Sequence, residues 1–157
     1  MNISKAGTVL ALLAFSSLAV AAGAPDFSGQ WKLNAARSTN LGMMAAVQQT
    51  LTITQTKAEL TLVEASDFQG QKSGRTLRYD LKGTPVMNEG GMGGQSETVA
   101  KWDGDKLVVT WTTDGAVAGT KNVRTETRAL GADGATMTVE SIRAANKPMV
   151  MVFERVK

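Results

Sequence analysis

Short runs of alternating apolar and polar residues recur along most of the chain. In one run Leu51 and Ile53 stand between threonines, and in another Leu77 and Tyr79 alternate with the charged residues Arg78 and Asp80. Because successive strand side chains point to opposite faces, each run predicts a β-strand with one apolar face. The runs are 26–34, 50–54, 59–62, 77–80, 97–102, 107–111, 122–130, 136–142 and 149–156. Turn residues separate the runs and no long helical pattern interrupts them, which predicts an all-β sandwich or barrel.

Two of the turns carry strong hairpin signals, Asp-Gly-Asp at 103–105 and Gly-Ala-Asp-Gly at 131–134. Whether the two-residue loop is 103–104 or 104–105, the strands on either side of it pair even-numbered positions with odd-numbered ones. Trp102 is therefore expected on the same face as Leu107 and Trp111. Two tryptophans on one face of a hairpin indicate that this face is buried.

Two segments depart from the strand pattern. Residues 41–48 are consistent with a short helix, for which Asn40 is a possible N-cap. The segment 82–95 contains five glycines at 83, 90, 91, 93 and 94 together with Pro85, and it predicts a mobile loop. Such a loop could serve as a lid at a barrel mouth or as a flexible connection without function, and we expect the connection.

The first residues have the pattern of an export signal. Lys5 supplies a positive charge, residues 8–20 are apolar, and small residues follow at 19–24. The apolar run is short of the roughly 20 residues that a membrane-spanning helix needs. The sequence therefore predicts a signal peptide over 1–22, a secreted or periplasmic protein, and one mature domain over 25–157.

Composition excludes several kinds of chemistry. The 157-residue chain has no histidine and no cysteine, and its formal net charge is +3. A Ser-His-Asp or Cys-His nucleophile and an ordinary zinc site are therefore excluded. No dense run of lysine and arginine is present, so a nucleic-acid partner is not expected.

Two sets of residues have metal-binding alternatives. Asp103, Asp105 and Asp133 could bind calcium, but calcium needs six or more oxygen ligands and these residues lie in predicted turns, where aspartate is favoured. Met149 and Met151 could bind Cu(I), although methionine more often fills a core. We expect turn and core roles, and we predict no metal site and no cofactor.

Charged residues in the run 122–130 have two interpretations. One interpretation pairs Glu126 with Glu140 as two acids on neighbouring strands, although Arg124 and Arg128 beside Glu126 favour its charged form. Arg124, Glu126 and Arg128 share one face, which is either a solvated surface or the wall of a polar cavity. We expect Arg124 to point outward, and both orientations remain open for Arg128.

Three short motifs stand out: Phe27-x-Gly29-x-Trp31 in the first strand, Lys-Trp-Asp-Gly at 101–104, and the closing run 152–156. They resemble motifs of the calycins, the superfamily of lipocalins and fatty-acid-binding proteins. The resemblance implies an up-and-down barrel of about 8–10 strands, lipocalin-like and with an internal cavity. Gly29 is expected to allow a close approach of a neighbouring group.

The chain departs from the resembling family where the ligand is anchored. Fatty-acid-binding proteins hold the ligand carboxylate with an Arg-x-Tyr pair on the closing strand, and the matching positions here are Met151 and Phe153. A second family arginine matches Arg128. The resemblance also implies a structural role for Trp31, whose ring would close one end of the barrel under Arg155 or Arg128.

Together these observations predict a non-enzymatic protein that binds a small apolar or amphipathic molecule inside the barrel. The residues predicted to line the ligand site are Leu51, Ile53, Tyr79, Trp102, Val109, Trp111, Arg128, Met151 and Phe153. The residues predicted to have structural roles are Gly29, Trp31 and Arg155. The alternative is a barrel filled with side chains that acts through its loops on another protein, and an enzyme with paired carboxylates is a third hypothesis.

Overall fold

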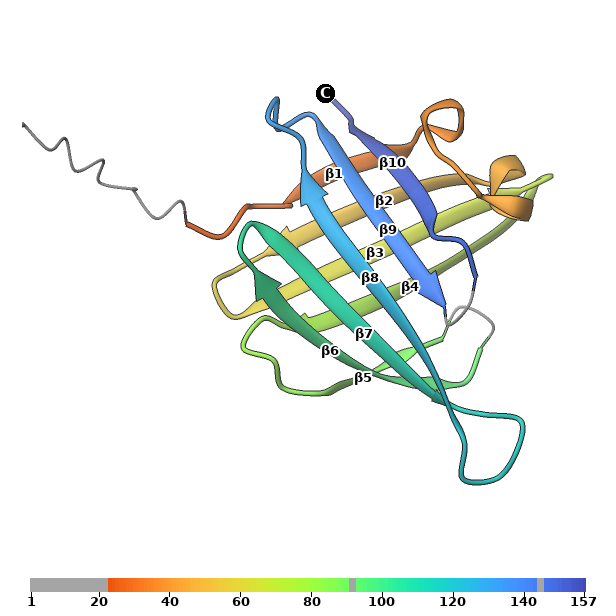
Figure 1. Cartoon of the computed structure of the whole chain (residues 1–157). Coiled ribbons are helices and arrows are strands. Elements are labelled where there is room, and N and C mark those ends of the chain that lie inside the picture. Colours follow the sequence, from red (N-terminus) through yellow and green to blue (C-terminus); the bar gives the residue numbers. More distant parts are fainter. Residues whose placement is uncertain (1–22, 91–92, 144–145) are drawn as a thin grey trace, which may run out of the picture.

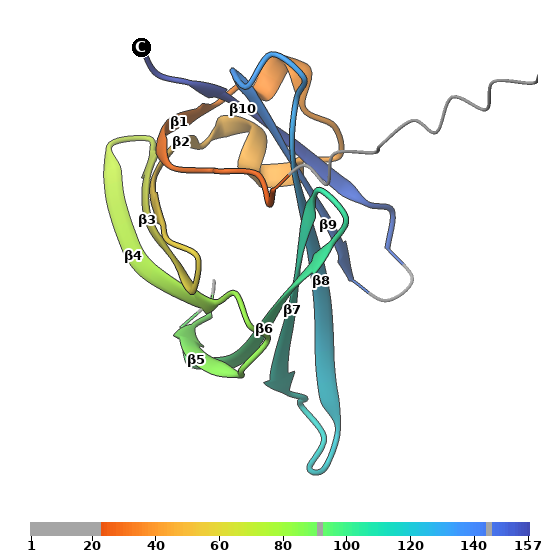
Figure 2. The ribbon, with the colours of Figure 1, turned by 90° about the vertical axis from the view of Figure 1, so that its left-hand side faces the viewer.

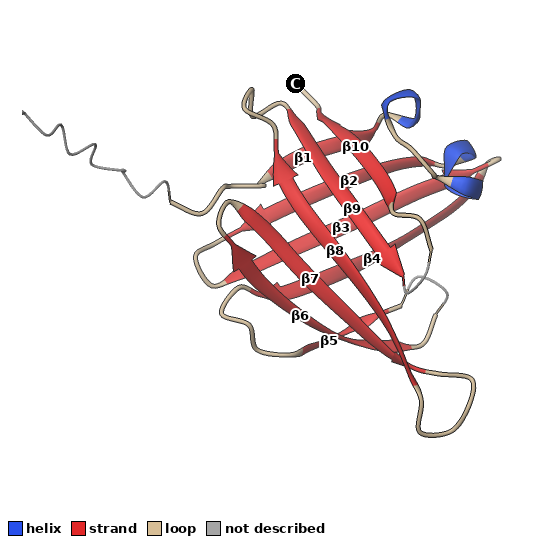
Figure 3. Cartoon of the chain, viewed as in Figure 1, coloured by secondary structure: helices blue, strands red, loops and turns tan. Residues whose placement is uncertain are grey.

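The computed structural model describes residues 23–90, 93–143 and 146–157. Within these ranges the chain forms ten strands and two short 3-10 helices (Figure 1, Figure 3). The elements are β1 (Gly29–Leu33), η1 (Ala35–Arg37), η2 (Gly42–Ala46), β2 (Gln48–Gln55), β3 (Glu59–Phe68), β4 (Gln71–Asp80), β5 (Val86–Glu89), β6 (Gln95–Asp103), β7 (Lys106–Asp114), β8 (Lys121–Leu130), β9 (Thr136–Arg143) and β10 (Met149–Arg155). The predicted signal peptide, residues 1–22, lies outside the described residues.

The strands form one antiparallel sheet in the order β4-β3-β2-β1-β10-β9-β8-β7-β6-β5. β1 pairs with both β2 and β10, so the first strand joins the two halves of the chain. The sheet curls until its edge strands β4 and β5 approach each other. In Figure 2, β1 to β4 face β6 to β9 across the interior. The prediction of an all-β, up-and-down barrel is confirmed.

The side chain of Asn88 joins the two edge strands. Its Oδ1 accepts a hydrogen bond from the Arg78 amide at 2.8 Å, and its Nδ2 donates to the Arg78 carbonyl at 2.8 Å. The same Nδ2 lies 2.6 Å from Thr98 Oγ1, on β6. A buried side chain thus satisfies the backbone groups that a paired strand would satisfy elsewhere in the sheet.

One end of the barrel is closed by aromatic side chains. Trp31 is fully buried, and its Nε1 donates to the Phe27 carbonyl at 2.9 Å. Phe27 stacks on Trp102 with ring centroids 6.1 Å apart. The segment that precedes β1 therefore covers this end of the barrel.

Arg155, rather than Arg128, lies over the Trp31 ring, with its guanidinium carbon 4.2 Å from the ring centroid. Arg155 also donates to the carbonyls of Ser28 and Gly134. A Cβ at Gly29 would meet Arg155 Nη1 at 2.5 Å, and the φ of Gly29 is +128°. Glycine is therefore required here by its backbone angle and by the approach of the arginine.

The two predicted hairpin turns are present. Asp103 pairs with Lys106, which leaves a two-residue loop and places Trp102 opposite Leu107, on the interior face. In the other turn Asp133 Oδ1 accepts hydrogen bonds from the amides of the two residues at 135 and 136. Asp133 thus has a turn role, as predicted.

The predicted helix at 41–48 is present only as η2, a 3-10 helix over Gly42–Ala46. The predicted Asn40 cap is wrong, because Leu41 is the N-cap residue and makes no side-chain capping bond. Asn40 has a φ of +56° and its Nδ2 donates to the Pro148 carbonyl at 2.8 Å. It therefore ties the connection after β1 to the residues before β10.

The expectation of one continuous loop over 82–95 is also wrong. Val86–Glu89 forms β5, which pairs with β6 in register Val86 to Thr98 through Glu89 to Gln95. Glycines at both ends of the segment obscured this short strand in the sequence. Pairing with β6 and the Asn88 bonds to β4 stabilise it, and both are tertiary contacts.

Candidate functional site

The end of the barrel opposite Trp31 opens into a cavity of about 1070 Å³. Its floor and walls come from strands on both sides of the barrel, and its mouth includes η2, glycines that follow β5, and the adjoining ends of β7 and β8. The lining residues on which the argument below depends are Gln49, Leu51, Leu62, Glu64, Arg75, Trp111, Arg124, Glu126, Arg128, Val139, Met149, Met151 and Phe153. Part of the segment 82–95 reaches this mouth, since Gly90, Gly93 and Gly94 also line it.

Part of the cavity lining is apolar. Leu51 on β2, Leu62 on β3, Val139 on β9, and Met151 and Phe153 on β10 line it. All five side chains are buried. They stand at alternate positions of their strands, so the same alternation that buries the core also forms this wall.

A polar part of the lining follows β8. Glu126 forms ion pairs with Arg124 at 3.2 Å and with Arg128 at 3.1 Å. The expectation that Arg124 points outward is wrong, since it shares the inward face of its two neighbours and lines the cavity. Its charge is accommodated there by Glu126 and by the Trp111 ring, whose centroid lies 4.6 Å from the guanidinium carbon.

The proposed pairing of Glu126 with Glu140 is wrong. Glu126 lies opposite Ser141 in the sheet, while Glu140 lies opposite Thr127 on the outer face. The two carboxylates therefore point to opposite sides of the barrel wall. They cannot act together in acid–base chemistry.

A second ion pair crosses from β3 to β4. Arg75 Nη2 lies 3.1 Å from Glu64 Oε2, and the two residues are directly opposite each other in the sheet. The Arg75 guanidinium also lies 5.8 Å from the Trp111 ring centroid. Trp111 thus has an arginine from β4 and an arginine from β8 near its ring.

Several polar atoms of this region have no hydrogen-bond partner among the described residues. They are Nε and Nη1 of Arg128, Nε1 of Trp111, the hydroxyl of Tyr79 and Oε1 of Gln49. All four side chains are almost completely buried. A buried polar group without a partner is costly, so these atoms are candidates for contact with a ligand.

Tyr79 lies between Arg128 and Trp111. The Arg128 guanidinium carbon is 5.9 Å from the Tyr79 ring centroid, and the Trp111 ring meets Tyr79 edge-on at 6.1 Å. Burial raises the pKa of Tyr79, so its hydroxyl stays protonated.

The structure separates the predicted ligand-site residues into three groups. Leu51, Trp111, Arg128, Met151 and Phe153 line the cavity. Ile53, Tyr79 and Val109 are buried in the core of the barrel, outside the set of lining residues.

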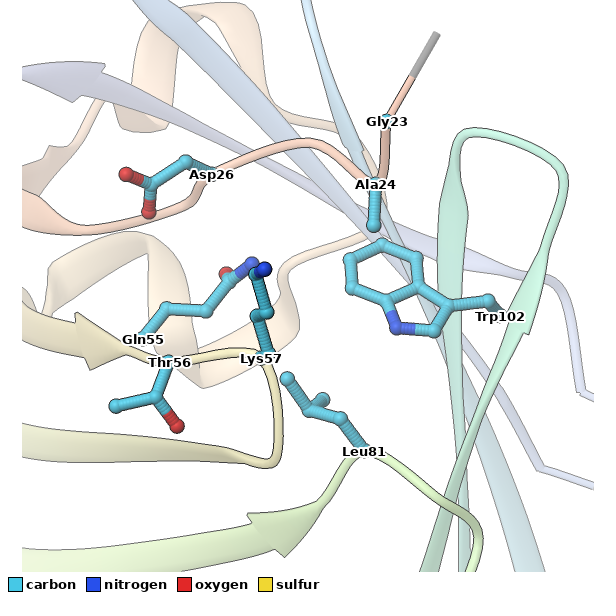
Figure 4. Close-up of a pocket in the computed structure, with 8 residues that line it drawn as sticks. All are labelled: Gly23, Ala24, Asp26, Gln55, Thr56, Lys57, Leu81 and Trp102. Atoms are coloured by element: carbon cyan, nitrogen blue, oxygen red, sulfur yellow. The ribbon is translucent and has the colours of Figure 1, made fainter. Parts of the chain in front are cut away.

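Trp102 lies at the closed end, away from the cavity. There it lines a smaller pocket of about 440 Å³ and its ring points toward Ala24 (Figure 4). Leu81 and Lys57 line the same pocket.

Sequence reasoning missed Gln49, Glu64 and Arg75 as cavity residues. Each stands two positions beyond a predicted inward residue, Gln49 before Leu51, Glu64 after Leu62 and Arg75 before Leu77. Extending the period-two pattern by one step would have found them.

In the part of the chain that the structure describes, no group of three or more acidic side chains could hold a metal ion. None of the helices in the described ranges is long and apolar enough to cross a membrane.

Comparison with known proteins identifies the fold but not a sequence family. No protein-family model matches the chain, and no curated protein matches it in sequence. Solved structures do match. Lipid binding protein 8 of Caenorhabditis elegans superposes with a TM-score of 0.64 and 12% identity, covering 83% of this chain and 95% of that protein.

Two further structures match over similar lengths. A Schistosoma mansoni fatty acid binding protein, solved with arachidonic acid, gives a TM-score of 0.63 and 20% identity over 83% of this chain and 96% of that one. Human cRBP IV gives a TM-score of 0.63 and 18% identity over 84% and 99%. The chain therefore has the calycin fold, as the resemblance of its motifs implied.

Proposed function

We propose that this chain is a non-enzymatic binding protein that holds a small amphipathic molecule in its barrel cavity. The observation that carries the proposal is a cavity lined by apolar side chains together with buried polar groups, among them donors without partners in the described chain. Ligand pockets in proteins usually have volumes of roughly 300–1,000 Å³. A cavity of about 1070 Å³ is large enough for a lipid-sized molecule.

The positions of the apolar and polar lining residues suggest how the ligand is oriented. Its apolar part would pack against Leu51, Met151 and Phe153, where burial of each Å² of apolar surface contributes roughly 25 cal/mol. Its polar end would face Arg128, whose Nε and Nη1 lack partners within the described chain.

The charge of the lining favours an anionic ligand. The charged lining residues in the described ranges are Glu64, Arg75, Asp114, Lys121, Arg124, Glu126, Arg128 and Arg143. Cations outnumber carboxylates in this set. An anion would therefore balance the cavity better than a cation.

The names of the structural neighbours support a binding role, because one of them was solved with a fatty acid bound. The alternative of a filled barrel does not fit a cavity of this volume. We also propose that the protein acts outside the cytoplasm, in the periplasm or beyond the cell. This rests on Lys5 and the apolar run that follows it.

A cavity-filling substitution tests the proposal. Met149 lines the cavity from β10, and Val150 is its outward-facing neighbour. We expect the purified mature protein to bind a hydrophobic fluorescent dye and to release it when oleate is added. Met149→Trp should weaken both interactions at least about tenfold, because the indole occupies ligand volume.

Val150→Trp is the matched control and should bind dye and oleate as the unmodified protein does. Circular dichroism and the melting temperature would verify that both variants are folded. A folded protein that binds neither dye nor oleate, or equal binding by the two variants, would contradict the proposal.

A further inference from the structure

The polar lining along β8, which we call the polar wall, is longer than a single polar head group of a ligand requires. Arg124 and Arg128 are four residues apart on β8, which is roughly 13 Å along a strand. Sheet register places Trp111 opposite Arg124, and Leu107 opposite Arg128. Polar lining groups thus occupy two levels, with Glu126 between them. The lower level is the one around Arg128, and the upper level is the one around Trp111 and Arg124.

Each level contains a buried donor without a partner in the described chain. Arg128 offers Nε and Nη1 at the lower level, and Trp111 offers Nε1 at the upper level. Both residues line the cavity and both are at least nine-tenths buried. A ligand with a single polar end would satisfy one level and leave the other facing a hydrocarbon chain, which is unfavourable for the unpaired group.

The kinds of unpartnered atoms narrow the chemistry of the second polar group. The upper level offers the Trp111 N–H, and Gln49, which also lines the cavity, offers an unpartnered acceptor, Oε1. A hydroxyl group donates and accepts, so it can serve a donor or an acceptor of this wall. A second anion is disfavoured, because Glu126 lies between the levels.

We infer that the ligand is a monoanionic amphiphile with one or more hydroxyl groups partway along its apolar body, rather than a simple head-and-tail lipid. The anion is held at Arg128 and the hydroxyl group at the level of Trp111 and Arg124. This inference rests on the proposed function and adds to it the class of ligand.

The test compares two molecules that differ only in the middle of the chain. Stearate and 9,10-dihydroxystearate share chain length and carboxylate, and the second carries hydroxyl groups halfway along. Binding of each to the mature protein would be measured by isothermal titration calorimetry. The sign of the difference is informative, because hydroxyl groups buried without partners would weaken binding.

We expect the dihydroxy acid to bind about tenfold more tightly, the gain from one well-placed hydrogen bond. Trp111→Phe keeps an aromatic ring near Arg124 but removes the N–H, and it should bring the affinity ratio of the two acids close to one. Thr125→Val, on the outer face of β8, is the control and should keep the ratio.

The outcomes separate the two claims. Equal affinities, or tighter binding of stearate, would overturn the inference and leave the proposed function intact. No binding of either acid by the folded protein would overturn both. A preference for the dihydroxy acid that persists in folded Trp111→Phe would overturn the assignment of the second polar group to Trp111.

Discussion

Replacing Asn88 with alanine removes the side chain that joins the edge strands β4 and β5. The native side chain makes three hydrogen bonds, two to the backbone of Arg78 and one to Thr98. A hydrogen bond contributes roughly 1 kcal/mol, so Asn88→Ala should lower the free energy of unfolding by about 3 kcal/mol. At roughly 2.1 cal/mol/K of unfolding entropy per residue, this corresponds to a fall in melting temperature of about 10 °C.

The effect should be local as well as global. The Arg78 amide donates to Asn88 Oδ1, so its hydrogen exchange should accelerate in Asn88→Ala more than exchange in the middle of β8. Met87→Ala, at an exposed neighbouring position on β5, is the control and should change the melting temperature by less than about 2 °C. A melting temperature for Asn88→Ala within 2 °C of the unmodified protein would refute the role of this side chain in closing the barrel.

Three further predictions concern stability and can be measured by urea or thermal unfolding. Gly29→Ala should cost about 1–3 kcal/mol, because a Cβ would meet a guanidinium at 2.5 Å in a backbone conformation with φ of +128°; an unchanged midpoint would contradict this. Glu126→Gln should cost about 3 kcal/mol, because the buried Arg128 and the partly buried Arg124 lose their carboxylate partner, whereas Glu140→Gln on the outer face should have little effect. Equal costs would contradict the assignment of the two glutamates to opposite faces. Hydrogen bonds, first that from the Asn34 amide, lower the pKa of Glu154. The stabilising contribution of the Glu154 carboxylate is thus complete above its ordinary pKa of 4.5 and is lost as pH falls through its lowered pKa. Glu154→Gln should therefore reduce the loss of stability on the acid side, and an unaltered dependence of stability on pH would argue against this.

The faces of the long strands could be predicted from the sequence, because alternation with period two is a local property. The length of the turn at 103–105 predicts that Trp102 and Leu107 share a face, and the observed register confirms it. Alternation also shows that Arg124 and Glu126 share a face, but it does not show that this face points inward. Whether that face points inward depends on ion pairs and on the Trp111 ring, which alternation does not contain.

The edge of the sheet was harder to predict than its centre. β5 has four residues, two of them polar, and no apolar alternation that exceeds the background. It exists because β6 pairs with it and because Asn88 reaches β4. Contacts between residues distant in the sequence decide such an element, and a single sequence does not display them.

The chemistry of the cavity followed only partly from the sequence. Arg128 was identified through a family likeness, and absent histidine and cysteine excluded many enzymes. Glu64 and Arg75 lie beyond the apolar runs 59–62 and 77–80, in parts of β3 and β4 that carry no clear alternation in the sequence. The β3–β4 register brings these two residues together, and register is set by the turn at 69–70 and by the whole hydrophobic face.

Native mass spectrometry of the purified mature protein, followed by organic extraction, tests the central claim most directly. If the cavity holds a ligand, the folded protein should carry an added mass that extraction removes, and protein stripped in this way should recover the mass when oleate is added. A protein that shows the mass of the bare chain both after purification and after incubation with oleate would contradict the assignment of this barrel as a ligand carrier.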